Sequence, residues 1–287
     1  MPTLLPSTLR SHRLPLDTSA QRLGFLEPVP EGERSDRAAL QARLARDGYL
    51  YLKGALNPAR VLAFREMYFR TLAETGLIAA GSPPLEGLSG DEILDPARVR
   101  RLLFDEIVRG EAYEALCTCE EIKGFYTWFL DRKVHLHKRK LIRHHRPQDT
   151  WTTPAHYDLV YLRGGTTRLL SSWIPLGDCP AERGGLTYLE GSHVWCEAFD
   201  RQATKKMVAE SITYDLRALA ETHQTRWLIA AYEAGDMVVH SPYIVHASLD
   251  NDDTRGVIRL STDIRYQRLD DAIDPRWQNH WREDDGL

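Results

Sequence analysis

The sequence lacks any apolar run of about 18 residues, the length that a membrane-spanning helix needs. Its N-terminus also lacks a charged segment followed by an apolar stretch, so we expect no signal peptide and a cytoplasmic location. Charge of one sign is not in large excess, because the formal net charge is only -4. These absences argue against a membrane protein and give no reason to expect a nucleic-acid-binding surface.

Cysteine is scarce, and its placement is irregular. Four cysteines in 287 residues are too few for the dense disulfide framework of a small secreted protein. Cys117 and Cys119 stand in a helical context without the spacing of a zinc knuckle, so we expect buried free thiols. Internal repeats, low-complexity tracts and flexible linkers are absent too. A short arm followed by a single domain, residues 36–287, with a sizeable core is therefore expected.

Helical patterns fill the first half of the chain. Residues 1–35 are rich in Pro, Ser and Arg without a period, which predicts an irregular arm lying over the domain. Asp36 and Asn57 are typical N-cap residues for the helices that follow them. Apolar residues three and four apart predict a helical part over residues 36–130, with helices near 37–46, 59–74, 95–108 and 111–130 and a short strand at 49–54.

Short apolar or alternating runs, separated by turn residues, take over from Val134 onward. Such runs predict the strands of an antiparallel sandwich or barrel core over residues 134–268. One helical insertion is expected at about 200–221, and residues 270–287 form a C-terminal tail. Strands that follow a helical first half predict an α+β fold in which the helices pack outside the barrel.

The stretch Thr153-Pro-Ala-His156-Tyr-Asp158-Leu-Val-Tyr-Leu162 holds a histidine and an aspartate two residues apart in an apolar, β-prone context. Residues two apart on a strand point to the same face, so this imidazole and this carboxylate are expected side by side. Together they form half of a metal site.

His246, which follows the apolar segment Asp236-Met-Val-Val239, is the best candidate for the other half. A lone histidine in an apolar strand is more often a hydrogen-bonded core residue. Here a metal-ligand role for His246 is favoured instead, because His156 and Asp158 already supply two ligands and a third would complete the set. Two histidines and one carboxylate leave three positions open on an iron, the arrangement that suits oxygen activation by non-haem Fe(II).

Arg259 and Ser261 face the same side of the strand predicted after His246. A guanidinium donates two parallel hydrogen bonds to a carboxylate, and a nearby hydroxyl adds a further donor. This pair would hold the distal carboxylate of a keto acid whose other end chelates the metal. Arg255 is the alternative anchor, because it lies closer to His246 in the sequence.

These residues, in this order, resemble the phytanoyl-CoA hydroxylase family of Fe(II)/2-oxoglutarate oxygenases. The resemblance is strongest over residues 153–266, and the order and spacing of its segments are more specific than any one of them. It is carried by His156-Tyr-Asp158, by Ser172-Trp173-Ile-Pro-Leu-Gly with Arg183-Gly-Gly-Leu-Thr-Tyr-Leu-Glu-Gly-Ser-His193, and by Ala234-Gly-Asp with His246-Ala-Ser248 and Arg259-Leu-Ser261.

The resemblance implies a double-stranded β-helix that uses Fe(II), 2-oxoglutarate and O2 and releases succinate and CO2. The implied iron ligands are His156, Asp158 and His246. The implied 2-oxoglutarate site consists of Arg259 with Trp173, Ser248 and Ser261 as neighbours. Hydroxylation or another oxidation is favoured over halogenation, because related halogenases lack the carboxylate that Asp158 provides.

The predicted strand 135–146 is rich in positively charged side chains, and its lysines and arginines lie within residues 138–146. Strand alternation sends roughly half of these side chains inward, where a buried cation needs a counter-charge. Two interpretations stay open: an acidic substrate group such as a carboxylate, or a solvated edge with ion pairs to Asp and Glu. Trp151, Tyr157 and Tyr161 have two possible roles as well: they line a substrate wall or belong to the core. The tail tryptophans Trp277 and Trp281 either dock the tail on the domain or form a lid.

We expect a small-molecule oxygenase of secondary metabolism that hydroxylates an unactivated C–H bond. The alternatives are a protein hydroxylase or demethylase on the same barrel and a non-catalytic metal-binding barrel. No additional module that would bind a peptide is visible in the sequence. Fold-level resemblance is a poor guide to the substrate, and the oligomeric state stays open as well.

Overall fold

Two β-sheets form the centre of the computed structural model, which describes residues 8–90, 95–147, 149–202 and 210–282. The larger sheet has six strands in the order β4-β10-β7-β12-β5, and β6 also pairs with β12. These strands are β4 (Tyr49–Leu52), β5 (Val134–Leu136), β6 (Leu141–His145), β7 (Leu170–Pro175), β10 (Met237–His240) and β12 (Arg259–Arg268).

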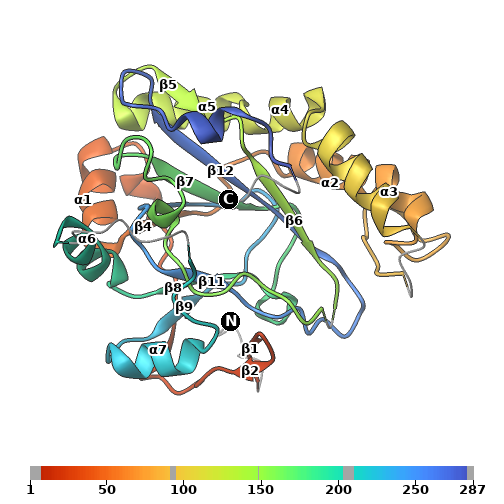
Figure 1. The fold of residues 1–287 in the computed structure, drawn as a ribbon, viewed down its shortest axis with the longest axis horizontal. Helices are drawn as coiled ribbons and strands as arrows, with labels where there is room; N and C mark the ends of the chain where they lie inside the picture. Colours follow the sequence, from red (N-terminus) through yellow and green to blue (C-terminus); the bar gives the residue numbers. More distant parts are fainter. Residues whose placement is uncertain (1–7, 91–94, 148, 203–209, 283–287) are drawn as a thin grey trace.

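The smaller sheet has four strands in the order β11-β8-β9-β3 and lies beneath the larger sheet in Figure 1. Its strands are β3 (Leu23–Phe25), β8 (Leu186–Leu189), β9 (Trp227–Ile229) and β11 (His246–Ser248). Side chains from both sheets share one buried cluster, which includes Trp173 of the larger sheet and Tyr188 of the smaller one. Two facing sheets with a shared interior confirm the predicted β-barrel core.

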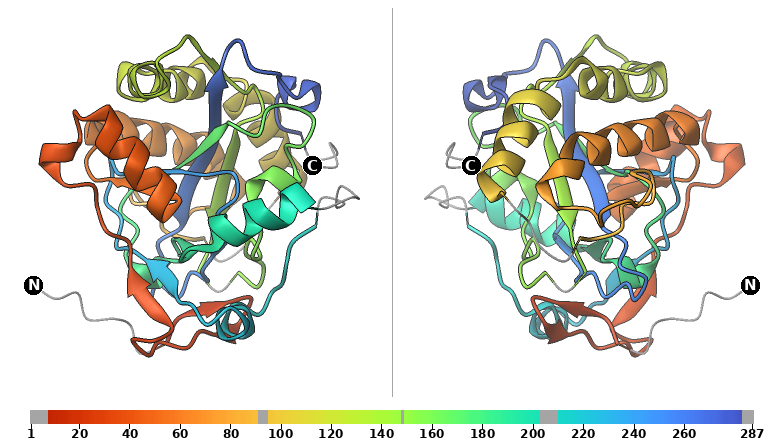
Figure 2. Two further views of the ribbon diagram at one scale, coloured as in Figure 1. Left: turned by 90° about the vertical axis from the view of Figure 1, so that its left-hand side faces the viewer. Right: turned by 90° about the vertical axis from the view of Figure 1, so that its right-hand side faces the viewer.

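Helices from the first half of the chain gather around the larger sheet, away from the smaller one (Figures 1 and 2). Strand β4 shows why: Leu50 and Leu52 pack into the helical cluster, while Tyr49 and Tyr51 point between the sheets. This alternation follows from strand geometry, in which successive side chains point to opposite faces of the sheet. The helices are α1 (Arg37–Asp47), α2 (Pro58–Leu72), α3 (Pro96–Arg101), α4 (Glu111–Cys117) and α5 (Glu120–Leu130), and a π-helical segment, η3 (Leu102–Ile107), continues α3.

The predicted helix starts in this half are confirmed. The Asp36 carboxylate accepts a hydrogen bond from the backbone of α1, the Asn57 side chain does the same for α2, and Gly48 ends α1 at a φ of 78°. The single helix expected at 111–130 is wrong, because the chain breaks between α4 and α5. Thr118 there leaves the helical conformation, and Cys119 restarts it as the next N-cap.

The N-terminal arm is more regular than predicted. It forms a small hairpin of β1 (Arg10–Ser11) with β2 (Leu14–Pro15), and then β3, which pairs in parallel with β9. Strand β3 forms because its backbone pairs with the edge of β9. Its three residues are too few to show an alternating pattern in the sequence, so the strand was not predicted. The arm is therefore an edge of the smaller sheet.

The helical insertion begins earlier than predicted and contains two helices. Helix α6 covers Ser192–Gln202, and α7 covers Leu216–Thr222 with Asp215 as its N-cap. Residues 203–209, which the prediction also included, lie outside the described residues. In the C-terminal tail, the 3-10 helix η6 (Pro275–Gln278) ends before Trp281, so the two tail tryptophans do not share one helix.

All four cysteines are buried free thiols, which confirms the prediction made for Cys117 and Cys119. Within the described ranges, no helix combines the length and the hydropathy that crossing a membrane requires.

Arg65 links the helical layer to the larger sheet and generates a test of the fold. Its side chain, which lies on α2, is buried and donates hydrogen bonds to the backbone carbonyls of Leu85, Glu86, Leu176 and Ile258. R65L should lower the free energy of unfolding by roughly 3 kcal/mol, because these carbonyls lose their donor. Denaturant unfolding measures the difference.

Arg60 of the same helix provides the control, because its exposed side chain pairs with Glu121 at the surface. R60L should unfold close to the wild-type midpoint. Equal midpoints for R65L and the wild type would contradict the structural role of Arg65.

Candidate metal and co-substrate site

Backbone pairing brings His156 and His246 together. The His156 N–H donates to the His246 carbonyl at 3.1 Å, and the His246 N–H donates to the His156 carbonyl at 2.9 Å. Residues that exchange both hydrogen bonds stand directly opposite each other, with their side chains on the same face. The two imidazole centroids are consequently 4.3 Å apart, although the residues are distant in sequence.

Each imidazole is held in one tautomer. The Nδ1 of His156 lies 2.8 Å from the carbonyl of Pro154, and the Nδ1 of His246 lies 3.0 Å from that of Ile244. A carbonyl only accepts, so both Nδ1 atoms carry the proton and both Nε2 atoms keep a lone pair. Burial lowers the pKa of His156 and holds that of His246 well below its usual range, so both rings are neutral at neutral pH.

Asp158 completes the cluster. Its Oδ1 lies 3.8 Å from each of the two Nε2 atoms, and one ligand atom of each of the three residues lies within 4.8 Å of the other two. Asp158 does not continue a strand as predicted but starts the 3-10 helix η4 (Asp158–Val160). Tyr157 before it is extended, with φ of -121° and ψ of 145°, and this single residue keeps Asp158 on the side of His156.

The Asp158 carboxylate is held by three polar neighbours. Arg265 donates to its Oδ1 at 3.0 Å, Ser171 donates to its Oδ2, and the Nε2 of His240 lies 3.5 Å from Oδ2. Burial alone would raise the pKa of Asp158, but the charge of Arg265 and the nearby imidazole of His240 hold this pKa well below its usual range. The carboxylate is therefore ionised and oriented before any metal binds.

Arg259 lies in the same interior, at the start of β12. Its Nη1 donates to the Ser261 hydroxyl at 2.6 Å, and its Nη2 donates to the Ser248 hydroxyl at 2.7 Å. Burial lowers the pKa of Arg259 to about 10, which leaves the guanidinium charged at neutral pH. Its buried Nε has no hydrogen-bond partner, and no described carboxylate forms an ion pair with it. A buried cation of this kind is suited to a carboxylate ligand.

The structure separates the two candidate anchors. Arg255 is two-thirds exposed and pairs with Asp253, 3.4 Å away. Arg259 instead shares the lining of a small cavity with His156, His246 and Trp173. Of these two candidates, Arg259 is the one that lies beside the histidines.

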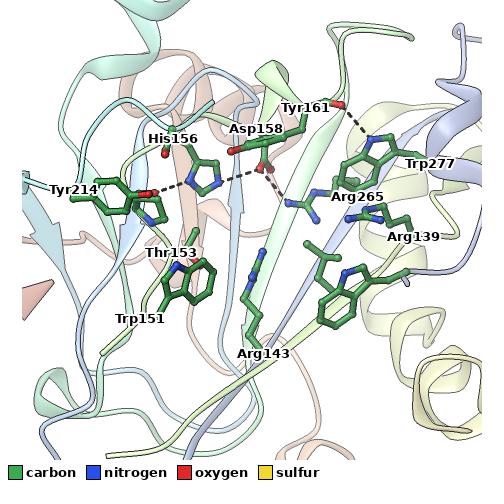
Figure 3. A pocket seen from close by; sticks show the side chains of 14 residues that line it. Arg139, Arg143, Trp151, Thr153, His156, Asp158, Tyr161, Tyr214, Arg265 and Trp277 are labelled. Atoms are coloured by element: carbon green, nitrogen blue, oxygen red, sulfur yellow. Dashed lines mark hydrogen bonds and ion pairs between the residues drawn. The ribbon is translucent and has the colours of Figure 1, made fainter. Parts of the chain in front are cut away.

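A larger cavity of about 390 Å³ opens beside this site (Figure 3). It contains His156 and Asp158 in its wall, so a molecule inside it reaches the metal cluster. The remaining walls combine aromatic and basic side chains: Trp151, Tyr161, Tyr214, Trp277, Trp281, Arg139, Arg143 and Arg265. Both tail tryptophans thus face this cavity, whereas Tyr157 is buried outside its lining.

The basic segment 135–146 is split between β5, β6 and the turn that joins them. Arg139 and Arg143 turn toward the larger cavity, whereas Lys140 is buried against Glu114 at 2.7 Å and His144 contacts the hydroxyl of Tyr68. Part of the segment therefore supplies charge to the cavity, Lys140 and His144 belong to pairs outside it, and Lys138 is exposed.

Sequence reasoning missed Arg265, His240 and Ser171 as neighbours of Asp158. Strand alternation gives a signal for one of them, because Arg265 lies on the same face of β12 as Arg259 and Ser261. Nothing in the sequence marks the other two, since their proximity to Asp158 depends on how β7 and β10 pair.

The donor set fits a non-haem iron. Two neutral imidazoles and one ionised carboxylate converge from His156, Asp158 and His246, and this is the facial ligand set of Fe(II) oxygenases. Over residues 44–257, the chain matches the model of the phytanoyl-CoA dioxygenase (PhyH) family.

The chain belongs to the phytanoyl-CoA dioxygenase family. It is therefore a 2-oxoglutarate-dependent non-haem iron oxygenase, as the sequence resemblance implied. The family match covers the ligand cluster and ends just before Arg259.

Two curated relatives of the chain are 1-deoxypentalenic acid 11-beta-hydroxylases. The protein from Streptomyces exfoliatus is 28% identical over 251 residues, which cover 81% of this chain and 81% of that protein. The protein from Streptomyces arenae is 25% identical over 242 residues, again with 81% of each chain covered.

Solved structures share the fold. The epimerase SnoN in complex with Fe3+, alpha ketoglutarate and nogalamycin RO gives a TM-score of 0.58 at 22% identity, over 84% of this chain and 88% of that one. EctD from S. alaskensis with bound Fe gives a TM-score of 0.59 at 15% identity, over 96% of this chain and 98% of that one. The predicted double-stranded β-helix is confirmed.

The depressed pKa of Asp158 generates a prediction about acid stability. A carboxyl group whose pKa is lower in the folded chain than in the unfolded chain, where it is about 3.9, adds stability above that value. This stability is lost as the pH falls toward the folded-state pKa. The wild type should therefore lose more unfolding free energy between about pH 6 and pH 3 than D158N does, which denaturant titrations of the metal-free protein measure.

D270N is the matched control, because Asp270 is exposed, and it should keep the wild-type pH dependence. The readout is the slope of the unfolding free energy against pH. The absolute free energy is not compared, because D158N also leaves Arg265 without its partner. Parallel curves for D158N and the wild type would contradict the account.

Proposed function

We propose that His156, Asp158 and His246 bind the iron and that Arg259 binds the distal carboxylate of 2-oxoglutarate. The observation that carries this proposal is the convergence of three ligand atoms within 4.8 Å beside a buried guanidinium that has no carboxylate partner among the described residues. A metal cation and a dicarboxylate supply the two charges that such a site is suited to receive.

The side chains around the ligands set the geometry of the site. The carbonyls of Pro154 and Ile244 keep both Nε2 lone pairs directed at the metal position. Ser248 and Ser261 fix the plane of the Arg259 guanidinium, so a carboxylate meets it in one orientation. When bound, iron and 2-oxoglutarate supply the oxidising power, with O2 consumed and succinate and CO2 released.

We assign the larger cavity to the substrate, a small metabolite that carries an acidic group. Trp151, Tyr161 and Trp277 offer flat apolar surfaces, while Arg143 and Arg265 offer positive charge. The curated relatives support the same class, because the compound in their names is a carboxylic acid. Hydroxylation of a C–H bond is the proposed outcome, since Asp158 occupies the ligand position that halogenation requires to be vacant.

A succinate-release assay tests the proposed function. The protein is supplied with Fe(II), 2-oxoglutarate and a panel of small cyclic carboxylic acids that begins with 1-deoxypentalenic acid. At least one acid should raise iron-dependent succinate formation and gain one oxygen atom, whereas H246A should show neither effect. Absence of iron-dependent oxygen uptake across the panel, in protein shown to bind both metal and 2-oxoglutarate, would contradict the proposal.

The two arginines give a second prediction. R259Q should raise the KM for 2-oxoglutarate by about 30-fold or more, because truncating one partner of a buried charge pair costs about 2 kcal/mol or more. R255Q is the matched control and should keep the wild-type KM, since Arg255 points into solvent. Steady-state titration of 2-oxoglutarate, followed by the formation of succinate or of the oxygenated acid, measures both KM values. A larger effect for R255Q than for R259Q would overturn the assignment.

A further inference from the structure

Arg265 has more hydrogen-bonding capacity than Asp158 uses. Its side chain is buried on β12, and only its Nη2 donates to the Asp158 carboxylate. Its Nε and Nη1 are buried without a hydrogen-bond partner among the described residues. Unpaired buried donors are costly, and Arg265 is one of the residues that line both cavities.

Trp277 fixes the plane of this guanidinium. The Arg265 guanidinium carbon lies 5.0 Å from the centre of the Trp277 ring, within cation–π distance. The ring itself is anchored by its N–H, which donates to the carbonyl of Tyr161 at 3.2 Å. A guanidinium packed against a ring keeps its donors in the plane of the fork, where they reach a planar anion.

Arg143 supplies a second guanidinium to the same space. It lies on β6 opposite Ser261 of β12, and its side chain is 28% exposed. Its nearest carboxylate, Asp263, is 3.6 Å from its Nε, which is beyond hydrogen-bond distance. Figure 3 shows Arg143 and Arg265 directed into the same part of the larger cavity, beneath Asp158.

The charges of the site favour one more anion. Three arginines and one aspartate line the smaller cavity, Arg143, Arg259, Arg265 and Asp263, and Asp158 stands in the wall of the larger cavity beside it. The divalent metal and the dicarboxylate of the proposed function cancel each other, so an excess of positive charge remains in a buried setting. A buried cation is stabilised by a hydrogen-bonded counter-ion.

We propose that Arg265 and Arg143 form a second carboxylate-binding subsite, separate from Arg259, that holds the acidic group of the substrate beside Asp158. This inference rests on the proposed function in taking the larger cavity as the substrate pocket. Arg265 is then a shared residue: one N–H orients the metal-ligating carboxylate, and the remaining N–H groups bind the substrate. Arg143 binds the substrate without touching a metal ligand.

Binding of a flat carboxylate to the full-length, metal-free protein tests the subsite. The probe is 1-naphthoate, whose ring suits the aromatic wall, and the matched neutral probe is 1-naphthalenemethanol. Calorimetric titration should give at least about 10-fold tighter binding for the acid, because only the acid forms charge-assisted hydrogen bonds. R143Q should weaken naphthoate binding by about 10- to 100-fold and leave the alcohol unchanged.

Three further variants locate the effect. R201Q removes an exposed arginine on α6 and should bind naphthoate as the wild type does. R259Q should also keep wild-type naphthoate affinity, because the two subsites are separate. R265Q should weaken both naphthoate binding and Fe(II) binding, whereas R143Q should leave the Fe(II) affinity unchanged, which distinguishes a shared residue from a pure substrate anchor.

Several results would overturn the subsite. These are equal affinities for the acid and the alcohol, no naphthoate binding at millimolar concentration, or R143Q binding naphthoate as the wild type does. Loss of naphthoate binding when Zn(II) and 2-oxoglutarate saturate the protein would also overturn it, since the anion would then have occupied the co-substrate's place. Because the naphthoate titrations need neither iron nor turnover, a failed succinate assay and a failed subsite give different results.

Discussion

One pair of backbone hydrogen bonds, between His156 and His246, determines whether this barrel can hold a metal. The bonds set the register of two segments far apart in sequence, and a slip of one residue would turn one imidazole to the opposite face. The same pairing places Asp158 beside both rings, because only the extended Tyr157 separates it from His156. The metal site is thus a consequence of strand register, which the surrounding sheets enforce.

Strand β12 carries the second constraint. Its outward residues, such as Leu260 and Ile264, pack against the helical layer, while Arg259, Asp263 and Arg265 face the interior. Placing this charge inside a barrel is costly unless each group has a partner. Asp158 stabilises Arg265, whereas Arg259 is held, among the described residues, by two serine hydroxyls and no carboxylate. Arg259, and the donors of Arg265 that Asp158 leaves unused, are therefore the groups that an anionic ligand would stabilise.

The sequence predicted the parts of this arrangement that depend on local chemistry. Capped helices such as α1, the two-residue spacing of His156 and Asp158, and the Arg259-x-Ser261 pair are all encoded in short segments. The prediction that His246 joins His156 and Asp158 agrees with the cluster that these three side chains form.

Features that depend on tertiary pairing were not predictable. The arm strand β3 forms only because the edge of β9 offers its hydrogen bonds, and the break at Thr118 leaves no clear signal in an amphipathic run. The partners of Asp158 come from three strands, so Ser171, His240 and Arg265 are united only after β7, β10 and β12 pair. Burial, which the sequence alone does not give, likewise separates Arg259 from the exposed Arg255.

We propose that His156, Asp158 and His246 form one iron site that also receives 2-oxoglutarate. An anaerobic titration with Fe(II) and 2-oxoglutarate, followed in the visible region, tests whether both ligands share this site. A weak charge-transfer band should saturate at one Fe(II) and one 2-oxoglutarate per chain and should disappear in H246A. A band of full intensity in H246A, or no band in a wild-type chain that binds both ligands, would contradict this proposal.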